Sequence, residues 1–218
     1  GAGGLEAVDY SGTIDGTTFL QNQVLGQGDQ FDQGGGAVAV LADPDTNRTV
    51  TIRNADIRQN EAPTAGGIAL VNVDLVLEDS VLDGNQTTTP QTPGAGAIGA
   101  VSNSVTQQVT ITASTITNNV SMSEAGGIGA ADVDLVITDS TISSNTAQAG
   151  RGGGIGLLGN QRNPILTASS VTVAGNQSGS DGGGLAFDNA GVDLTNVTIT
   201  GNQSGLQGGG IAVGASAP

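Results

Sequence analysis

The chain has 218 residues and a formal net charge of −15, with 20 Asp or Glu, five Arg, and no Lys, His or Cys. Five scattered arginines cannot build the basic surface that binds a nucleic acid backbone or an anionic membrane, so the composition excludes these partners. The lack of cysteine excludes a disulfide scaffold and a thiol enzyme. No apolar run reaches the length of about 18 residues that predicts membrane insertion. Aromatic residues make up 2% of the chain, which favours a narrow core of Val, Ile, Leu and Ala.

One short pattern, a hydrophobic residue followed by two spacers and an asparagine, occurs seven times, first at residues 19–22 and last at residues 199–202. A glycine cluster and a pair of strand-type apolar residues lie between successive copies. A fixed period of this kind predicts a solenoid. We therefore expect residues 1–218 to form one β-solenoid domain, part of a longer chain or a fibre subunit. The asparagines of the seven copies are Asn22, Asn60, Asn85, Asn119, Asn145, Asn176 and Asn202.

Residues 126–145 illustrate one coil. After the glycines, the alternation of apolar and polar residues predicts short strands at 128–130, 133–138 and 141–143. Three such strands in each of about seven coils predict an all-β fold, a single-stranded right-handed parallel β-helix. At about 4.8 Å for each coil, the rod would be roughly 34 Å long.

The coils alternate in length along the chain. Extra residues occur in every second coil, and the tripeptide Val-Asp-Leu at residues 73–75 recurs at 133–135 and 192–194, so the larger unit spans two coils. Loops that project from one face of a solenoid often form its binding side. The extra residues lie at 42–45, 101–108 and 159–164.

The repeated asparagine has a structural interpretation. We expect it to adopt the left-handed conformation or to cap a turn, with its side chain bonded to backbone groups. Stacked in register, the seven asparagines would form a ladder of amide hydrogen bonds. The glycine clusters are expected to supply positive φ at a tight corner.

The combination of glycine cluster and hydrophobic-x-x-Asn resembles the repeats of polymorphic outer-membrane proteins and of autotransporter passengers. The segments Phe19-Leu20-Gln21-Asn22 and Gly35-Gly36-Ala37-Val38 match this pattern best. Elsewhere Ile or Val replaces the Phe, and Ile often replaces the Ala. The resemblance implies a secreted or surface-exposed β-helix that is often adhesive.

Four acidic residues are candidate metal ligands. Asp43 and Asp45 lie in a long loop, and Asp132 and Asp134 lie at a coil corner. Calcium takes six to eight oxygen ligands from such loops. The nonapeptide spacing of calcium-binding β-rolls is absent. We expect solvated turn carboxylates and no cofactor, with calcium as the alternative.

Two other surface features of the sequence are relevant to catalysis and to ice binding. Asp79 and Asp139 occupy equivalent positions in alternate coils, and hydrolysis of a glycoside needs two carboxylates in one cleft. No His, Lys, Trp or arginine cluster accompanies them, so we expect no enzyme. Rows of threonine, such as residues 115–117 and 198–200, could bind ice, but the equivalent Arg53, Glu78 and Asp83 interrupt them.

Function is therefore predicted from architecture. The leading hypothesis is an extracellular or cell-surface structural or adhesive solenoid that associates end to end, or with further coils of the same chain, and that could contact surface glycans. Uncovered solenoid ends expose strand edges that need a cap or a partner. The alternative is a carbohydrate-binding or carbohydrate-active β-helix, similar to pectate lyase, that uses the long-loop face.

Overall fold

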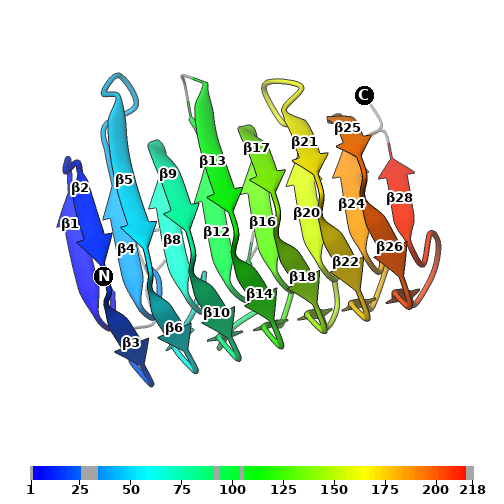
Figure 1. Cartoon of the computed structure of the whole chain (residues 1–218), viewed down its shortest axis with the longest axis horizontal. Helices are drawn as coiled ribbons and strands as arrows, with labels where there is room; N and C mark the ends of the chain where they lie inside the picture. The colour runs from blue at the N-terminus through cyan, green and yellow to red at the C-terminus, as the bar shows by residue number, and fades with distance from the viewer. Residues whose placement is uncertain (1, 26–33, 91–93, 104–105, 215–218) are drawn as a thin grey trace.

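A computed structural model describes residues 2–25, 34–90, 94–103 and 106–214, and these ranges form a parallel β-solenoid of about seven coils without a helix (Figure 1). The chain passes through up to four short strands in each coil. Every strand pairs in parallel with the equivalent strands of the neighbouring coils, so four sheets run along the rod. The all-β solenoid predicted from the repeats is confirmed.

The sheets are named A to D in the order in which a coil visits them. Sheet A contains β1 (Leu5–Val8), β4 (Val38–Leu41), β8 (Ile68–Val71), β12 (Ile98–Val101), β16 (Ile128–Ala131), β20 (Ile155–Leu158), β24 (Leu185–Asp188) and β28 (Ile211–Gly214). Sheet B contains β2 (Gly12–Asp15), β5 (Arg48–Arg53), β9 (Val73–Glu78), β13 (Gln107–Thr112), β17 (Val133–Thr138), β21 (Ile165–Ser169) and β25 (Gly191–Thr195).

The remaining two sheets are made of shorter strands. Sheet C contains β3 (Thr18–Leu20), β6 (Asp56–Arg58), β10 (Val81–Asp83), β14 (Thr115–Thr117), β18 (Thr141–Ser143), β22 (Thr172–Ala174) and β26 (Thr198–Thr200). Sheet D contains β7 (Glu61–Ala62), β11 (Gln86–Thr87), β15 (Val120–Ser121), β19 (Thr146–Ala147), β23 (Gln177–Ser178) and β27 (Gln203–Ser204). Sheet D adds a fourth strand to the three predicted, directly after the repeated asparagine.

Inward-facing side chains of sheets A, B and C fill a continuous core. In β9 the burial alternates residue by residue, so Leu75 and Leu77 point inward while the intervening Val76 faces out. Their register partners Val109 and Ile111 in β13 are equally buried and stack directly on them. Burying an aliphatic side chain of this size stabilises the fold by about 1.5–3 kcal/mol, so the stack of inward residues holds the coils together.

Single residues in the left-handed conformation make the corners. One lies between sheets B and C, as at Asp79 (φ 47°), and another between sheets C and D, as at Asn118 (φ 55°). The second one precedes the repeated asparagine, so the left-handed conformation expected for Asn119 is wrong, whereas the expected side-chain bonds to backbone groups are confirmed. The bend comes one residue earlier, so that the asparagine side chain can point into the interior.

The glycine clusters serve both positive φ and close packing: the first glycine of four clusters has the expected positive φ, namely Gly34, Gly152, Gly182 and Gly208. The other glycines of the clusters allow close packing. A Cβ atom at Gly66 would lie 2.2 Å from the backbone N of Gln86, and one at Gly67 would lie 2.6 Å from the carbonyl O of Ala97. Neither glycine has positive φ. The backbone of one coil here lies directly against that of the next, which only a residue without a side chain permits.

Candidate functional site

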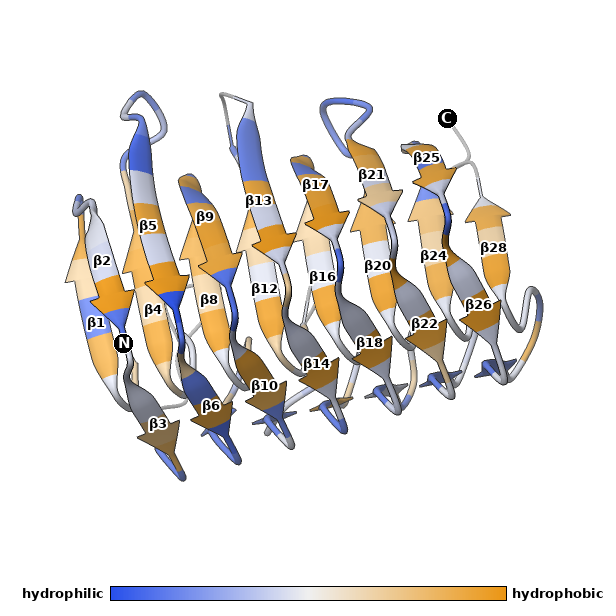
Figure 2. Cartoon of the chain, in the orientation of Figure 1, coloured by the Kyte–Doolittle hydropathy of each residue, from blue (hydrophilic) through white to orange (hydrophobic). Residues whose placement is uncertain are grey.

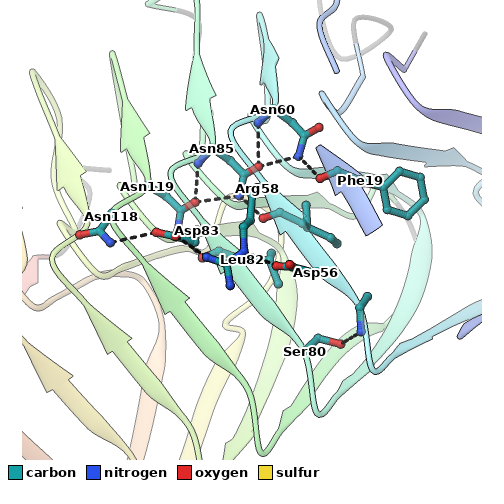
Figure 3. Close-up of polar contacts among 12 residues, drawn as sticks. Phe19, Asp56, Arg58, Asn60, Ser80, Leu82, Asp83, Asn85, Asn118 and Asn119 are labelled. Carbon is teal, nitrogen blue, oxygen red and sulfur yellow. Dashed lines mark hydrogen bonds and ion pairs between the residues drawn. The ribbon is translucent and has the colours of Figure 1, made fainter. Parts of the chain in front are cut away.

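The repeated asparagines form a continuous hydrogen-bonded ladder through the interior (Figure 3). Oδ1 of Asn85 accepts hydrogen bonds from the backbone N (3.1 Å) and Nδ2 (2.9 Å) of Asn60. The backbone N and Nδ2 of Asn85 donate in turn to Oδ1 of Asn119, at 2.9 and 3.0 Å. The same two bonds recur at every step of the series Asn22, Asn60, Asn85, Asn119, Asn145, Asn176 and Asn202.

Only an amide side chain can sustain this arrangement. Asn119 is fully buried, and its Nδ2 also donates to the carbonyl O of Leu82 at 3.0 Å. A carboxylate could accept but not donate, and a hydroxyl is too short to satisfy both neighbours. Each unsatisfied buried polar group would cost about 1–3 kcal/mol. The asparagines therefore have a structural role that fixes the register of the coils.

A second ladder of serines was not predicted. Oγ of Ser114 accepts from the backbone N of Ser80 at 3.2 Å and donates to the carbonyl O of Thr112 at 2.8 Å. Ser140 repeats the pattern in the next coil, and Ser80 caps the amide of Ala55 (Figure 3). The signal was present in the sequence, since these serines all lie five residues before a repeated asparagine.

The acidic residue Asp132 anchors a loop. It is 3% exposed, and its Oδ1 accepts hydrogen bonds from the backbone N of Asn160, Gln161 and Arg162 at 2.9–3.0 Å. Oδ1 of Asp134 accepts one more, from Ile165 at 2.8 Å. One carboxylate oxygen of Asp132 and one of Asp134 thus accept backbone amides from residues 160–162 and 165.

A corner residue that bonds a neighbouring long loop, as Asp132 does, recurs in every second coil and accounts for the alternation of long and short coils. In every second coil one residue in the left-handed conformation joins sheets A and B, and its side chain bonds the long loop of a neighbouring coil. Nδ2 of Asn72 donates to the carbonyl O of Ala42, and its Oδ1 accepts from the backbone N of Asn103. Nδ2 of Asn189 donates to the carbonyl O of Gly159. Residues 104 and 105 of the middle loop lie outside the described residues.

The other two predicted ligands, Asp43 and Asp45, lie exposed in the first long loop. The carbonyl O of Asp43 accepts from the backbone N and Oγ1 of Thr46, which closes a turn. Among the residues that the structure describes, no three acidic side chains gather where they could hold a metal ion. Two of the four candidates therefore lie in a turn, and the other two lie at a coil corner, where they bond the loop of the next coil.

Two exposed carboxylates near the N-terminal end have lowered pKa values. The pKa of Asp15 falls because its side chain accepts hydrogen bonds from Asn54 and from Arg53, at 2.9 and 3.0 Å. For Asp9, partial desolvation acts in the opposite direction, but hydrogen bonds from Thr46 and Arg48 together lower the pKa. Both contacts join the first coil to the second.

The residues weighed for catalysis and for ice binding do not assemble into one site. Asp79 and Asp139 are exposed corner residues with positive φ, and one whole coil separates them. The hydroxyl row of Thr112, Thr138, Ser169 and Thr195 on sheet B ends at Glu78. On sheet C, Arg58 pairs with Asp56 and with Asp83 (2.7 Å), in line with Thr117 (Figure 3).

The outer face of sheet A is apolar along most of the rod (Figure 2). One outward column consists only of Ala and Gly from β4 to β28, and a second holds mostly Val, Leu and Ala. The corner segments that precede the strands cover the first column. A Cβ atom added at Gly129 would contact Ala95 and Ala125 of those segments at 3.2 and 3.3 Å.

This cover opens over β16, β20 and β24. The covering position holds Gly35, then Ala65, Ala95 and Ala125 in the middle coils, and then Gly152 and Gly182, so the methyl group that covers the middle coils is absent here. A pocket of about 390 Å³ lies at this point, with Gly129, Gly156, Leu158 and Ala186 on its floor. Its polar lining consists of Glu124, Arg151, Asn160 and Asp188.

Comparisons with known proteins add no identity: no family model matches the chain, and neither does any curated protein or solved structure. Within the described ranges, no helix is long and apolar enough to cross a membrane. The structure shows a parallel β-solenoid, and the resemblance to outer-membrane repeats rests on the sequence motifs alone.

Proposed function

We propose that the chain is a structural and adhesive β-solenoid of an extracellular or cell-surface rod, without enzymatic activity, and that its ends stack on further coils, either of the same chain or of other copies that pair end to end into fibres. The observation that carries the proposal is the exposure of core positions at the two described ends. Leu5 is 38% exposed, Ile211 39% and Val213 72%, whereas their register partners Val38, Leu185 and Phe187 are at most 1% exposed.

The two ends are complementary to each other. In each step of the ladder, the backbone N and Nδ2 of one asparagine donate to Oδ1 of the next. At the last coil, no described residue accepts the backbone N–H of Asn202. At the first coil, no described residue donates to Oδ1 of Asn22. A second copy placed in line would continue the ladder and bring Leu5 over Ile211. Such a head-to-tail contact does not close on itself and generates a fibre.

The sequence resemblance supports the surface location, and the charge of the chain affects how its copies associate. A net charge of −15 keeps a rod soluble but opposes association of its copies through long-range repulsion. Salt screens this repulsion beyond about 8 Å at physiological ionic strength. We therefore expect end-to-end pairing to strengthen as salt is added, in contrast to a contact made by ion pairs.

Negative-stain imaging of the purified chain over a range of protein and salt concentrations tests the proposal. Unbranched fibres one solenoid wide are expected, and Val213→Asp should abolish them by placing a charge in the end contact. Ile165→Asp, at a 49% exposed position on the side of the rod, is the matched control and should leave fibres intact. Discrete short rods under all conditions would refute end-to-end assembly.

A further inference from the structure

Charged side chains gather beside the apolar columns of sheet A over β16, β20 and β24, and they continue toward β28, where Arg151, Asp181 and Asp188 line a second pocket. The position four residues before each strand holds Gly34, Thr64 and Gly94 in the earlier coils, and then Glu124, Arg151 and Asp181. The second outward column runs through Leu41, Val71, Val101, Ala131 and Leu158 before it reaches Asp188. Polar groups thus lie at the same part of sheet A where the covering corner segments lack a methyl group.

We infer that this pocket binds one ring of a neutral pyranose saccharide. The inference rests on the adhesive part of the proposed function, for which it names the ligand class. Gly156 and Leu158 are partly exposed and form the accessible part of the floor, which offers apolar surface to the C–H face of a sugar ring, while Gly129 and Ala186 lie buried beside them. The volume of about 390 Å³ lies within the range of about 300–1,000 Å³ that is typical of small-molecule sites.

The polar lining selects a neutral ligand. Arg151 is already paired with Asp188, whose side chain is 12% exposed, so its charge is compensated. Glu124 adds an unbalanced negative charge, which disfavours an acidic sugar. Sugar hydroxyls can both donate to carboxylates and accept from a guanidinium or an amide. Glu124 and Asn160 both line the pocket, Glu124 from the corner segment and Asn160 from the loop that Asp132 anchors.

The loop that Asp132 anchors contributes a wall to the pocket. Asn160 enters the lining only because the amides of residues 160–162 are fixed on Asp132. Binding groups held on a rigid scaffold lose less entropy when a ligand binds. The long loop at 159–164 therefore supplies one wall of the site, in the manner expected of loops that project from one face of a solenoid.

Titration of ¹⁵N-labelled chain with cellobiose, maltose and lactose, followed by amide chemical shifts, tests the inference. Saturable shifts of Gly156, Leu158 and Ala186 are expected with at least one of the three, and digalacturonate should bind more weakly. Gly156→Val fills the floor and should abolish the shifts. Gly99→Val makes the same change in the same column outside the pocket, so binding should persist. Glu124→Gln should weaken binding about tenfold, as expected for loss of a charged hydrogen-bond partner.

The possible outcomes separate this inference from the proposed assembly. No saturable shift with any neutral disaccharide, equal binding by Gly156→Val, or preference for digalacturonate would each overturn the saccharide site. None of these results changes the fibres seen by electron microscopy. Conversely, short rods that still bind a neutral disaccharide would refute end-to-end pairing and leave the pocket in place.

Discussion

The first three coils and the last four share one interior but differ on their outer faces. At the last position of the sheet B strands, the early coils present Asp15, Arg53 and Glu78, and the later coils present hydroxyl groups. A similar change occurs on sheet C, from Arg58 and Asp83 to Thr117 and Ser143, although Ala174 follows them in the same row. Meanwhile the asparagine ladder passes through both parts with the same two bonds at each step.

This difference shows which positions determine the fold. Outward positions tolerate a charge, a hydroxyl or an apolar group, because exposed ion pairs contribute only about 0–1 kcal/mol. Inward positions are restricted to groups that stack on their equivalents, because an unsatisfied amide or a cavity there costs several times more. The outer faces are thus free to carry function, and the sheet A pocket is an example of local variation on a constant interior.

The largest effect is expected from breaking the ladder at its centre. Asn119→Ala removes the acceptor of Asn85 and the donor to Asn145 and Leu82, all in a fully buried position. We expect the free energy of unfolding, measured by urea denaturation, to fall by about 3–5 kcal/mol. Asn202→Ala at the half-buried end should cost clearly less. Equal losses at both positions would contradict a continuous ladder.

The next effect concerns the loop anchor. Asp132→Ala leaves three backbone amides of residues 160–162 without their acceptor, so we expect a loss of about 2–3 kcal/mol and faster hydrogen exchange in this loop. Asp134→Ala, which removes a single bond to Ile165, should cost about 1 kcal/mol.

The same two variants, Asp132→Ala and Asp134→Ala, test whether these carboxylates bind calcium. If these carboxylates serve the loop, EDTA should leave the melting temperature of the unmodified chain unchanged, and added calcium should not raise it. A rise in melting temperature with calcium that Asp132→Ala abolishes would instead assign a metal to this corner.

A smaller effect is expected from acid at the N-terminal coils. The pKa of Asp15 and of Asp9 is lowered in the folded chain from the ordinary value of 3.8. A carboxylate with a lowered folded pKa contributes stability above its unfolded pKa and loses it as the pH falls through the folded pKa. Amide exchange in residues 5–20 should therefore accelerate below about pH 4 before that of the central coils. Asp15→Asn should remove part of this difference, and uniform acceleration along the rod would contradict it.

The smallest effect is expected on the hydroxyl rows. Oγ1 of Thr112 and of Thr138 lie 3.1 Å apart on the surface of sheet B. Thr138→Val should change the free energy of unfolding by less than about 0.5 kcal/mol, because Val is an equally good strand residue. Arg58→Met, which removes two ion pairs, should cost somewhat more. A large loss for Thr138→Val would show that the outer rows also specify the fold.

The sequence predicts the solenoid well because its signal is repeated in every coil. The asparagines and glycine clusters mark the coil length, and the alternation in residues such as 133–138 marks sheet B. Strands of two residues, such as Gln86–Thr87, are too short to show a period, so sheet D was missed. The left-handed residue lies one position before the repeated asparagine, where the coils carry different residue types such as Gln59, Asn118 and Ser144, so no repeated residue marks it.

Site prediction was weaker for a physical reason. Asp132 and Asp134 lie two residues apart in one tripeptide, yet only the former is buried beneath a loop of the next coil. That difference depends on which coil carries the longer loop. The sheet A pocket depends on the change from Ala125 to Gly152 at equivalent positions, which becomes visible only once the strands are in register.

A double-mutant cycle on Asn85 and Asn119 tests most directly whether the ladder holds the coils in register. Unfolding free energies would be measured for Asn85→Ala, Asn119→Ala and the double variant. Because the two side chains bond each other, the ladder predicts a coupling of about 1–3 kcal/mol between them. The two losses should add within about 0.5 kcal/mol for the distant pair Asn60 and Asn176. Additive losses for Asn85 and Asn119 as well would contradict the ladder as the element that aligns the coils.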